Sequence, residues 1–185
     1  MKPKEYMTDR LRLSVADESD ENRITEYVVR NRAFLAAWEP SRSPDYYTPN
    51  RQKELIQFDQ ECMEQGQLFK VWLSPLLQPE LIIGSVALSN IVRGAFLSCH
   101  MGYRLDEKWL NKGYMTEALE KVVSVAWHEL GLHRIEANIM PRNAASLRLT
   151  EKLGFQREGL ARQYLKINGK WEDHVHMTIL NEDMD

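Results

Sequence analysis

The segment from Trp109 to Ala118 contains residue types suited to holding an anion where a strand passes into a long helix. The first N–H groups of a helix have no acceptor within the helix, and the positive end of the helix dipole adds to their attraction for a pyrophosphate. Gly113 permits close approach of a ligand, Lys112 adds positive charge and Thr116 offers a hydroxyl donor. The alternative is a helix start that binds nothing, and this segment alone does not decide between the two.

A second candidate is the run Asn143-Ala144-Ala145-Ser146 at the predicted start of the next helix. An asparagine there is typical of a plain N-cap, whose side chain accepts a hydrogen bond from the helix backbone. A binding role requires a ligand alongside it.

Other conspicuous residues have structural explanations that compete with functional ones. His174 and His176 lie on one face of a strand without a third metal ligand at a useful spacing, so we predict solvent-facing histidines and no metal. Trp38, Tyr46 and Tyr47 either cover the core or line a groove for an acceptor substrate. The two cysteines have no Cys-x-x-Cys spacing, which indicates unpaired thiols.

Composition limits the class of protein. The chain has 185 residues, 43% hydrophobic and 28% charged, and a formal net charge of −3. We therefore predict one domain over residues 1–185, with no basic surface for nucleic acid. No apolar run is long enough for a membrane span or resembles a secretory signal, so we expect a cytoplasmic protein without membrane association.

Hydrophobic periodicity predicts the elements that position these residues. In the first half we expect a strand over 8–15, a helix over 20–37, an exposed Pro-rich loop, a helix over 51–64 and strands over 68–73, 81–90 and 95–104. In the second half we expect a helix over 113–130, a strand over 134–140, a short helix ending at Gly154 and a hairpin turning at Asn168-Gly169. This order predicts an α/β protein with a mixed sheet.

Short motifs along nearly the whole chain resemble those of the GNAT superfamily of N-acyltransferases and occur in the same order. Within that superfamily the chain resembles the ribosomal-protein alanine N-acetyltransferases of the RimJ/RimL group. The matching pieces are Thr8–Leu13, Phe34 with Trp38-Glu39-Pro40, Ile83-Gly84, Val92–Phe96 with Cys99, Gly102-Tyr103, Lys112–Ala118, His133–Ile135, Met140–Asn143, Leu153–Phe155, Glu158-Gly159 and Asn168–His174.

The resemblance implies a GNAT-like, mostly antiparallel central sheet flanked by helices, with strands that splay apart at an acetyl-coenzyme A site. The implied donor-binding residues are Met101, Tyr103, Leu105, Leu110, Asn111, Lys112, Gly113, Tyr114, Met115, Thr116, Asn138, Asn143 and Ser146. The loop over 110–116 would take the diphosphate, and Ser146 would lie near the sulfur and protonate the leaving thiolate. Trp38, Glu39, Tyr46 and Tyr47 are the expected acceptor-binding residues.

The sequence departs from the superfamily where catalysis is concerned. Leu110 and Met115 replace the usual ends of the phosphate loop, and Asn138, Thr150 and Leu165 stand where various relatives have catalytic groups. His100 is the most available base, with Glu158 as a second candidate acting through water.

We therefore predict an enzyme that transfers acetyl from acetyl-coenzyme A to an amine, chiefly the N-terminal α-amine of a ribosomal or other protein. A small-molecule acetyltransferase acting on an antibiotic, polyamine or amino acid is the alternative, and a coenzyme A sensor without turnover is a third hypothesis. Either a monomer or a homodimer is compatible with the sequence.

Overall fold

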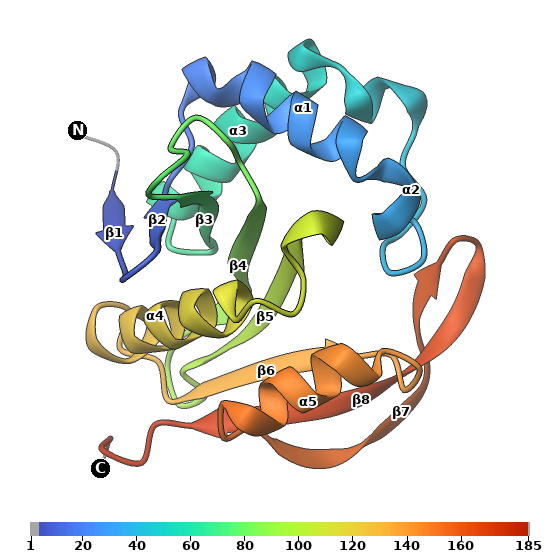
Figure 1. The fold of residues 1–185 in the computed structure, drawn as a ribbon. Helices are drawn as coiled ribbons and strands as arrows, with labels where there is room; N and C mark the ends of the chain where they lie inside the picture. Colours follow the sequence, from blue (N-terminus) through green and yellow to red (C-terminus); the bar gives the residue numbers. More distant parts are fainter. Residues whose placement is uncertain (1–3, 185) are drawn as a thin grey trace.

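The protein is built on one sheet of eight strands, which lie in the order β1-β2-β3-β4-β5-β6-β8-β7 (Figure 1). The computed structural model describes residues 4–184. The strands are β1 (Glu5–Met7), β2 (Leu11–Ser14), β3 (Phe69–Pro75), β4 (Gly84–Val92), β5 (Ser98–Leu105), β6 (Arg134–Ile139), β7 (Gln156–Ile167) and β8 (Lys170–Leu180). All neighbours pair antiparallel except β5 and β6, which are parallel. The predicted mixed, mostly antiparallel sheet is confirmed.

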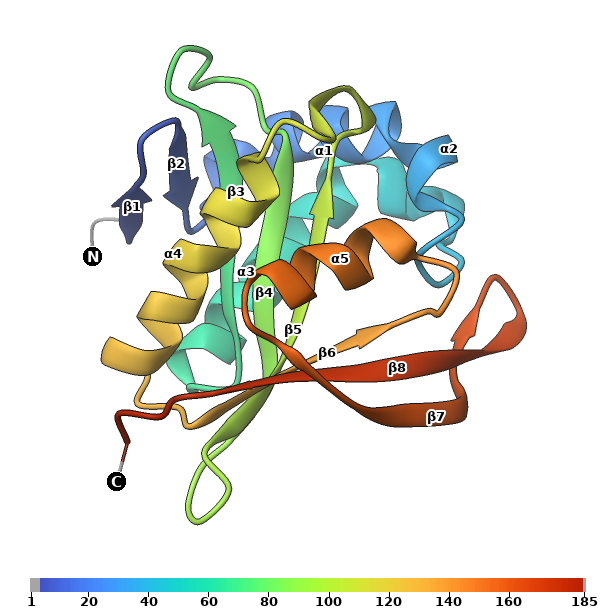
Figure 2. The same ribbon diagram turned by 60° about the horizontal axis from the view of Figure 1, so that its bottom comes forward.

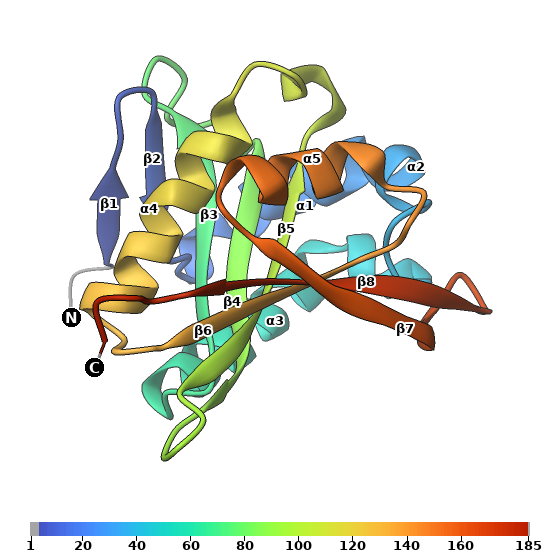
Figure 3. The ribbon, with the colours of Figure 1, turned by 90° about the horizontal axis from the view of Figure 1, so that it is seen from below.

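Helices cover both faces of this sheet. They are α1 (Glu21–Arg30), α2 (Arg32–Leu35), α3 (Pro49–Glu64), α4 (Tyr114–His128) and α5 (Ala144–Lys152), with short 3₁₀ turns at Glu18–Asp20, Pro44–Tyr47 and Glu107–Trp109. Helices α4 and α5 lie on one face, and α1 and α3 lie on the other (Figures 2 and 3). No helix within residues 4–184 has the length and apolar character needed to cross a membrane.

Each face has its own hydrophobic core. The larger core joins α4 to the sheet through fully buried side chains such as Leu119, Val71 and Ile135. The smaller core lies beneath α1 and α3, around Ile24, Tyr27 and Trp72. Burying a large apolar side chain contributes about 1.5–3 kcal/mol, so these cores fix the sheet between its helices.

Local signals correctly placed the starts of two helices and the turn of one hairpin. Gly113 precedes α4 with a left-handed φ of 80°, and Asn143 caps α5 by accepting a hydrogen bond from the Ser146 N–H at 3.2 Å. The β7–β8 hairpin turns at Asn168 and Gly169, whose φ angles are 46° and 81°. An Asn-Gly pair favours a tight turn because both residues accept positive φ. The predicted turn is therefore present.

The structure differs from the prediction in the first third of the chain. The three-residue strand β1 was not predicted, and the helix expected over 20–37 divides at Asn31. The Asn31 side chain donates to the Tyr27 carbonyl at 3.0 Å and to Asp106 Oδ2 at 3.1 Å, and such bonds compete with the helical ladder. Tyr46, expected in an exposed loop, is buried in the smaller core.

Gly84 provides a test of the packing between β4 and β5. A Cβ at this position would lie 2.5 Å from the Arg104 carbonyl oxygen, which is backbone and cannot move cheaply. Gly84→Ala should therefore lower the free energy of unfolding by about 2 kcal/mol, within the range typical of overpacking. Denaturant titration of the unliganded protein measures it.

Gly102 on β5 supplies the matched control. A Cβ there would meet nothing within 4 Å, so Gly102→Ala should leave stability unchanged or raise it by up to about 1 kcal/mol. Equal stability of the two variants would contradict the close approach at Gly84.

Candidate active site

The candidate site is a cleft where the two parallel strands separate. Pairing between β5 and β6 covers only Ser98–His100 against Arg134–Glu136. Beyond these residues lies a cleft of about 630 Å³, bordered by 101–105 on β5 and by 137–140 on and after β6. The predicted splayed strands are thus present. Most of the predicted donor-binding residues border this cleft: Met101, Tyr103, Leu105, Leu110, Asn111, Gly113, Tyr114, Met115, Thr116, Asn138, Asn143 and Ser146.

The first turn of α4 presents main-chain donors at one end of the cleft. The first intrahelical bond runs from the Glu117 N–H to the Gly113 carbonyl at 3.1 Å, so the N–H groups of residues 114–116 have no intrahelical acceptor. Lys112 does not border the cleft, because its Nζ donates to the Lys108 carbonyl at 2.8 Å. The attraction for an anion at this end therefore comes from backbone N–H groups and the helix dipole.

Arg10 fixes this loop, a contact that the sequence did not reveal. Its guanidinium donates to the Lys112 carbonyl at 2.9 Å and to Glu117 Oε2 at 2.7 Å, and lies over the Tyr114 ring. The partners are more than a hundred residues apart, so only tertiary structure brings them together.

A pair of hydroxyl groups joins the two walls of the cleft. Tyr103 Oη on β5 lies 2.5 Å from Ser146 Oγ on α5. Burial raises the pKa of Tyr103 to about 12, although its hydrogen bond with Ser146 acts in the opposite direction. The phenol therefore stays protonated near neutral pH and can donate to Ser146, which leaves the serine hydroxyl proton free to point into the cleft.

His174 is buried and borders the cleft, in contrast to the predicted solvent-facing histidine. The residue is 3% exposed, and its Nδ1 lies 3.0 Å from the Glu172 carbonyl oxygen. A carbonyl only accepts hydrogen bonds, so Nδ1 carries the proton and neutral His174 has a lone pair on Nε2. Strand alternation placed His174 on the polar face but gave no sign that Tyr164, whose ring centroid is 5.6 Å away, helps to cover it.

The two predicted bases, His100 and Glu158, both lie outside the cleft. His100 Nε2 is 3.6 Å from Glu136 Oε1, and the Glu158 carboxylate receives bonds from Arg134 at 2.9 and 2.6 Å. The bonds from Arg134 hold the pKa of Glu158 below its usual value, which makes this carboxylate a weaker base.

His176, expected in solvent, is instead partly covered. Its Nδ1 lies 3.0 Å from Glu136 Oε1, and its buried Nε2 has no hydrogen-bond partner among residues 4–184. Within the same residues, no group of three His, Cys, Asp or Glu side chains is placed to hold a metal ion.

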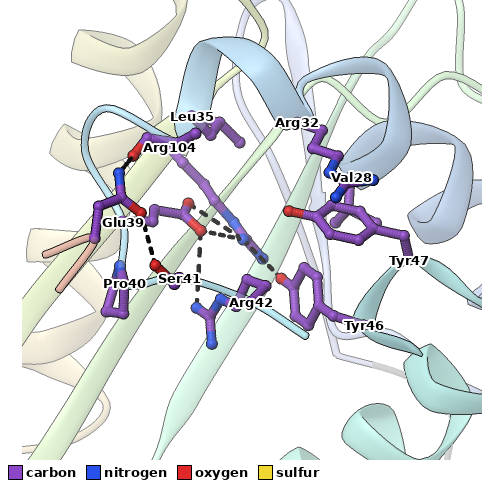
Figure 4. Close-up of a pocket in the computed structure, with 12 residues that line it drawn as sticks. Val28, Arg32, Leu35, Glu39, Pro40, Ser41, Arg42, Tyr46, Tyr47 and Arg104 are labelled. Carbon is purple, nitrogen blue, oxygen red and sulfur yellow. Dashed lines mark hydrogen bonds and ion pairs between the residues drawn. The ribbon is translucent and has the colours of Figure 1, made fainter. Parts of the chain in front are cut away.

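The predicted acceptor-binding residues divide between two cavities. Trp38 and Glu39 border the cleft, whereas Tyr46 and Tyr47 border an adjoining pocket of about 190 Å³, which Glu39 also lines (Figure 4). Arg104, which is not among the predicted site residues, lines both cavities. Its only sequence signal was an arginine between Tyr103 and Leu105 on a half-buried strand.

Within the described residues, the sheet opens at its one parallel pair, and the glycine-led start of α4 borders the same opening. Residues 10–156 match the acetyltransferase (GNAT) domain family, and the chain belongs to that family. It is an acetyltransferase of the GNAT type.

Particular relatives are similar over most of the chain. A probable N-acetyltransferase of Bacillus subtilis, YjcK, is 46% identical over 153 residues, which are 83% of this chain and 84% of that protein. The [ribosomal protein uS5]-alanine N-acetyltransferase of Escherichia coli is 38% identical over 176 residues, or 95% of this chain and 90% of that enzyme. The crystal structure of the ribosomal-protein-S5-alanine acetyltransferase of Vibrio fischeri superposes with a TM-score of 0.93 at 35% identity, covering 98% of this chain and 99% of that one.

Proposed function

We propose that this protein transfers the acetyl group of acetyl-coenzyme A to the N-terminal α-amine of a protein, with a ribosomal protein as the acceptor. The observation that carries this proposal is the 38% identity to the uS5-alanine N-acetyltransferase, which extends over 95% of the chain. The similarity therefore extends over nearly all of the chain, which includes most of the residues that line the two cavities.

The cleft suits the donor chemically. The N–H groups of residues 114–116 would receive the diphosphate, and Gly113, in its left-handed conformation, keeps side-chain atoms away from it. The edges of β5 and β6 that face the gap offer main-chain groups to the amides of the pantetheine arm. Asn138 Oδ1 is buried without a hydrogen-bond partner among the described residues, and its residue borders the gap.

The chain's own residues position the reactants and move protons. Acetyl-coenzyme A supplies a thioester that is already activated, so the protein needs no nucleophile of its own. We propose that His174 Nε2 takes the proton released when the amine attacks. Ser146, whose Oγ accepts from Tyr103, gives its proton to the sulfur as the carbon–sulfur bond breaks, and the proton held by His174 then returns to the serine through water. An α-amine has an ordinary pKa near ~8, so a neutral imidazole is a sufficient base.

Donor binding at α4 can be tested through the charge of one side chain. Saturating acetyl-coenzyme A should raise the melting temperature, since a ligand at a hundredfold excess over its Kd stabilises the folded state by about 2.7 kcal/mol. Thr116→Glu should abolish this shift by repelling the diphosphate, whereas the neutral Thr116→Gln, of equal size, should retain most of it. A full shift in the folded glutamate variant would place the diphosphate elsewhere.

The acceptor class is tested by measuring thiol release with three sets of amines. We expect N-terminal peptides of ribosomal proteins to be acetylated at the α-amine, and expect little turnover with lysine side chains or small amines. Mass spectrometry of the products locates the acetyl group. Turnover confined to small amines would overturn the proposed acceptor.

The proposed proton transfers predict the effect of two substitutions. His174→Asn keeps a donor for the Glu172 carbonyl but removes the proton acceptor, so kcat should fall by a factor of about 10² to 10⁴. Ser146→Ala should lower kcat at least ~10-fold without raising the donor Kd.

His128→Asn provides the histidine control, because His128 is exposed at the end of α4. Pre-steady-state and steady-state kinetics separate donor binding from chemistry. Wild-type kcat in His174→Asn would show that solvent takes the proton.

A further inference from the structure

The pocket beside the cleft, which we call the arginine pocket, is lined from three separate parts of the chain (Figure 4). Its wall includes Arg32 on α2, Arg42 in the segment that follows α2, and Arg104 on β5. The tip of the β7–β8 hairpin closes one side, because Asn168 bonds to Ser41 Oγ at 3.0 Å and to the Ala36 carbonyl. With a volume of about 190 Å³, the pocket has room for one side chain or a small ligand.

One carboxylate lines this pocket, and it is already neutralised. Arg104 Nη1 lies 3.3 and 3.4 Å from the two oxygens of Glu39 and 3.0 Å from Tyr46 Oη, and its Nε donates to Ser85 Oγ. Figure 4 shows the Arg104 side chain reaching between Glu39 and Tyr46. With side chains only 16% and 20% exposed, Arg104 and Glu39 form a half-buried ion pair.

The other two arginines leave an excess of positive charge. Arg32 has no acidic partner within residues 4–184, and Arg42 approaches Glu39 only to 3.7 Å. Three arginines against one glutamate give the pocket wall a formal charge of +2, in a chain whose net charge is −3. This local reversal of sign favours an anionic group in the pocket.

Aromatic rings hold both of these guanidinium groups. Arg32 lies 4.4 Å from the centroid of the Tyr47 ring, and Arg42 lies 4.7 Å from that of Tyr46. A guanidinium stacked on a ring keeps the N–H donors along its edge available. A planar carboxylate accepts two such donors at once, which gives arginine its selectivity for this group.

The arginine pocket shares part of its wall with the cleft in which the acceptor amine is proposed to react. Leu35, Glu39 and Arg104 line both cavities. The two cavities are therefore close enough for one peptide to reach both, with its first residue in the cleft and one of its next few residues at the pocket.

We propose that the arginine pocket is an acceptor-specificity site that binds the carboxylate of an Asp or Glu side chain close to the acceptor's N-terminus. This proposal rests on the proposed function and adds the class of peptide that the enzyme prefers. Arg32 and Arg42 supply the donors, while Arg104, which also bonds to Tyr46, neutralises Glu39.

The test uses acceptor peptides that begin with alanine and carry either Glu or Gln at position two, three or four. At one position the wild-type enzyme should favour Glu by about tenfold in kcat/KM, the effect of one charge-assisted hydrogen-bonded pair. Arg32→Gln and Arg42→Gln should each move the Glu-to-Gln ratio of kcat/KM toward one, chiefly through KM.

Arg51→Gln is the matched control. It removes the same charge from the surface of α3, where Arg51 pairs with Glu54, and it should preserve the ratio. Circular dichroism verifies that each variant is folded. Equal use of Glu and Gln peptides by the wild type, or a ratio that survives both pocket substitutions, would overturn the proposal and leave the proposed function standing.

A separate set of assays gives the enzyme free α-amino acids as acceptors. Their α-carboxylate can bind arginine in the same way as the side-chain carboxylate of Asp or Glu. If these compounds alone were acetylated, and with a dependence on Arg32, the pocket would serve a small acceptor. That result would overturn both the peptide specificity and the proposed protein acceptor. Rejection of peptides and amino acids alike, with turnover of uncharged amines, would likewise overturn both.

Discussion

The candidate site depends on one feature of the sheet, which is that β5 and β6 stop pairing after three residues. Each strand keeps its other neighbour, β4 for β5 and β8 for β6, so the strands remain ordered while the edges facing the gap have no strand partner. An unpaired main-chain group away from water costs about 1–3 kcal/mol. An extended ligand that contains amides recovers this cost, so the separation of the strands also creates the binding surface.

Hydrogen bonds from side chains in the N-terminal third of the chain hold the walls of this gap in place. Asp106, directly after β5, accepts hydrogen bonds from Arg30 at 2.6 Å and from Asn31 at 3.1 Å. Burial opposes the charge of Asp106, but these bonds prevail and hold its pKa below the usual value. Arg10 likewise secures the loop before α4. The β1–β2 turn and α1 therefore act on the site although neither borders the cleft.

Most elements followed from local sequence patterns, whereas the polar contacts at the site did not. The apolar periodicity of α4 and the Asn-Gly turn are local signals, and the structure agrees with both. The break at Asn31 depends on Asp106, which is 75 residues away. The burial of His174 depends on a neighbouring strand. The positions of the cleft residues came from resemblance to a family, because periodicity reports which face of an element is apolar and not where two strands diverge.

The charges around the cleft are arranged to keep the acceptor amine reactive. A free carboxylate beside the amine would stabilise its ammonium form, which cannot attack a thioester. Among residues 4–184, Glu39 is the one carboxylate that borders the cleft, and Arg104 pairs with both of its oxygens. The hydroxyls of Tyr103 and Ser146 also border the cleft and carry no charge near neutral pH. In the proposed reaction the Arg104–Glu39 pair therefore has an electrostatic role besides a structural one, since a paired Glu39 does not hold the acceptor amine as an ion pair.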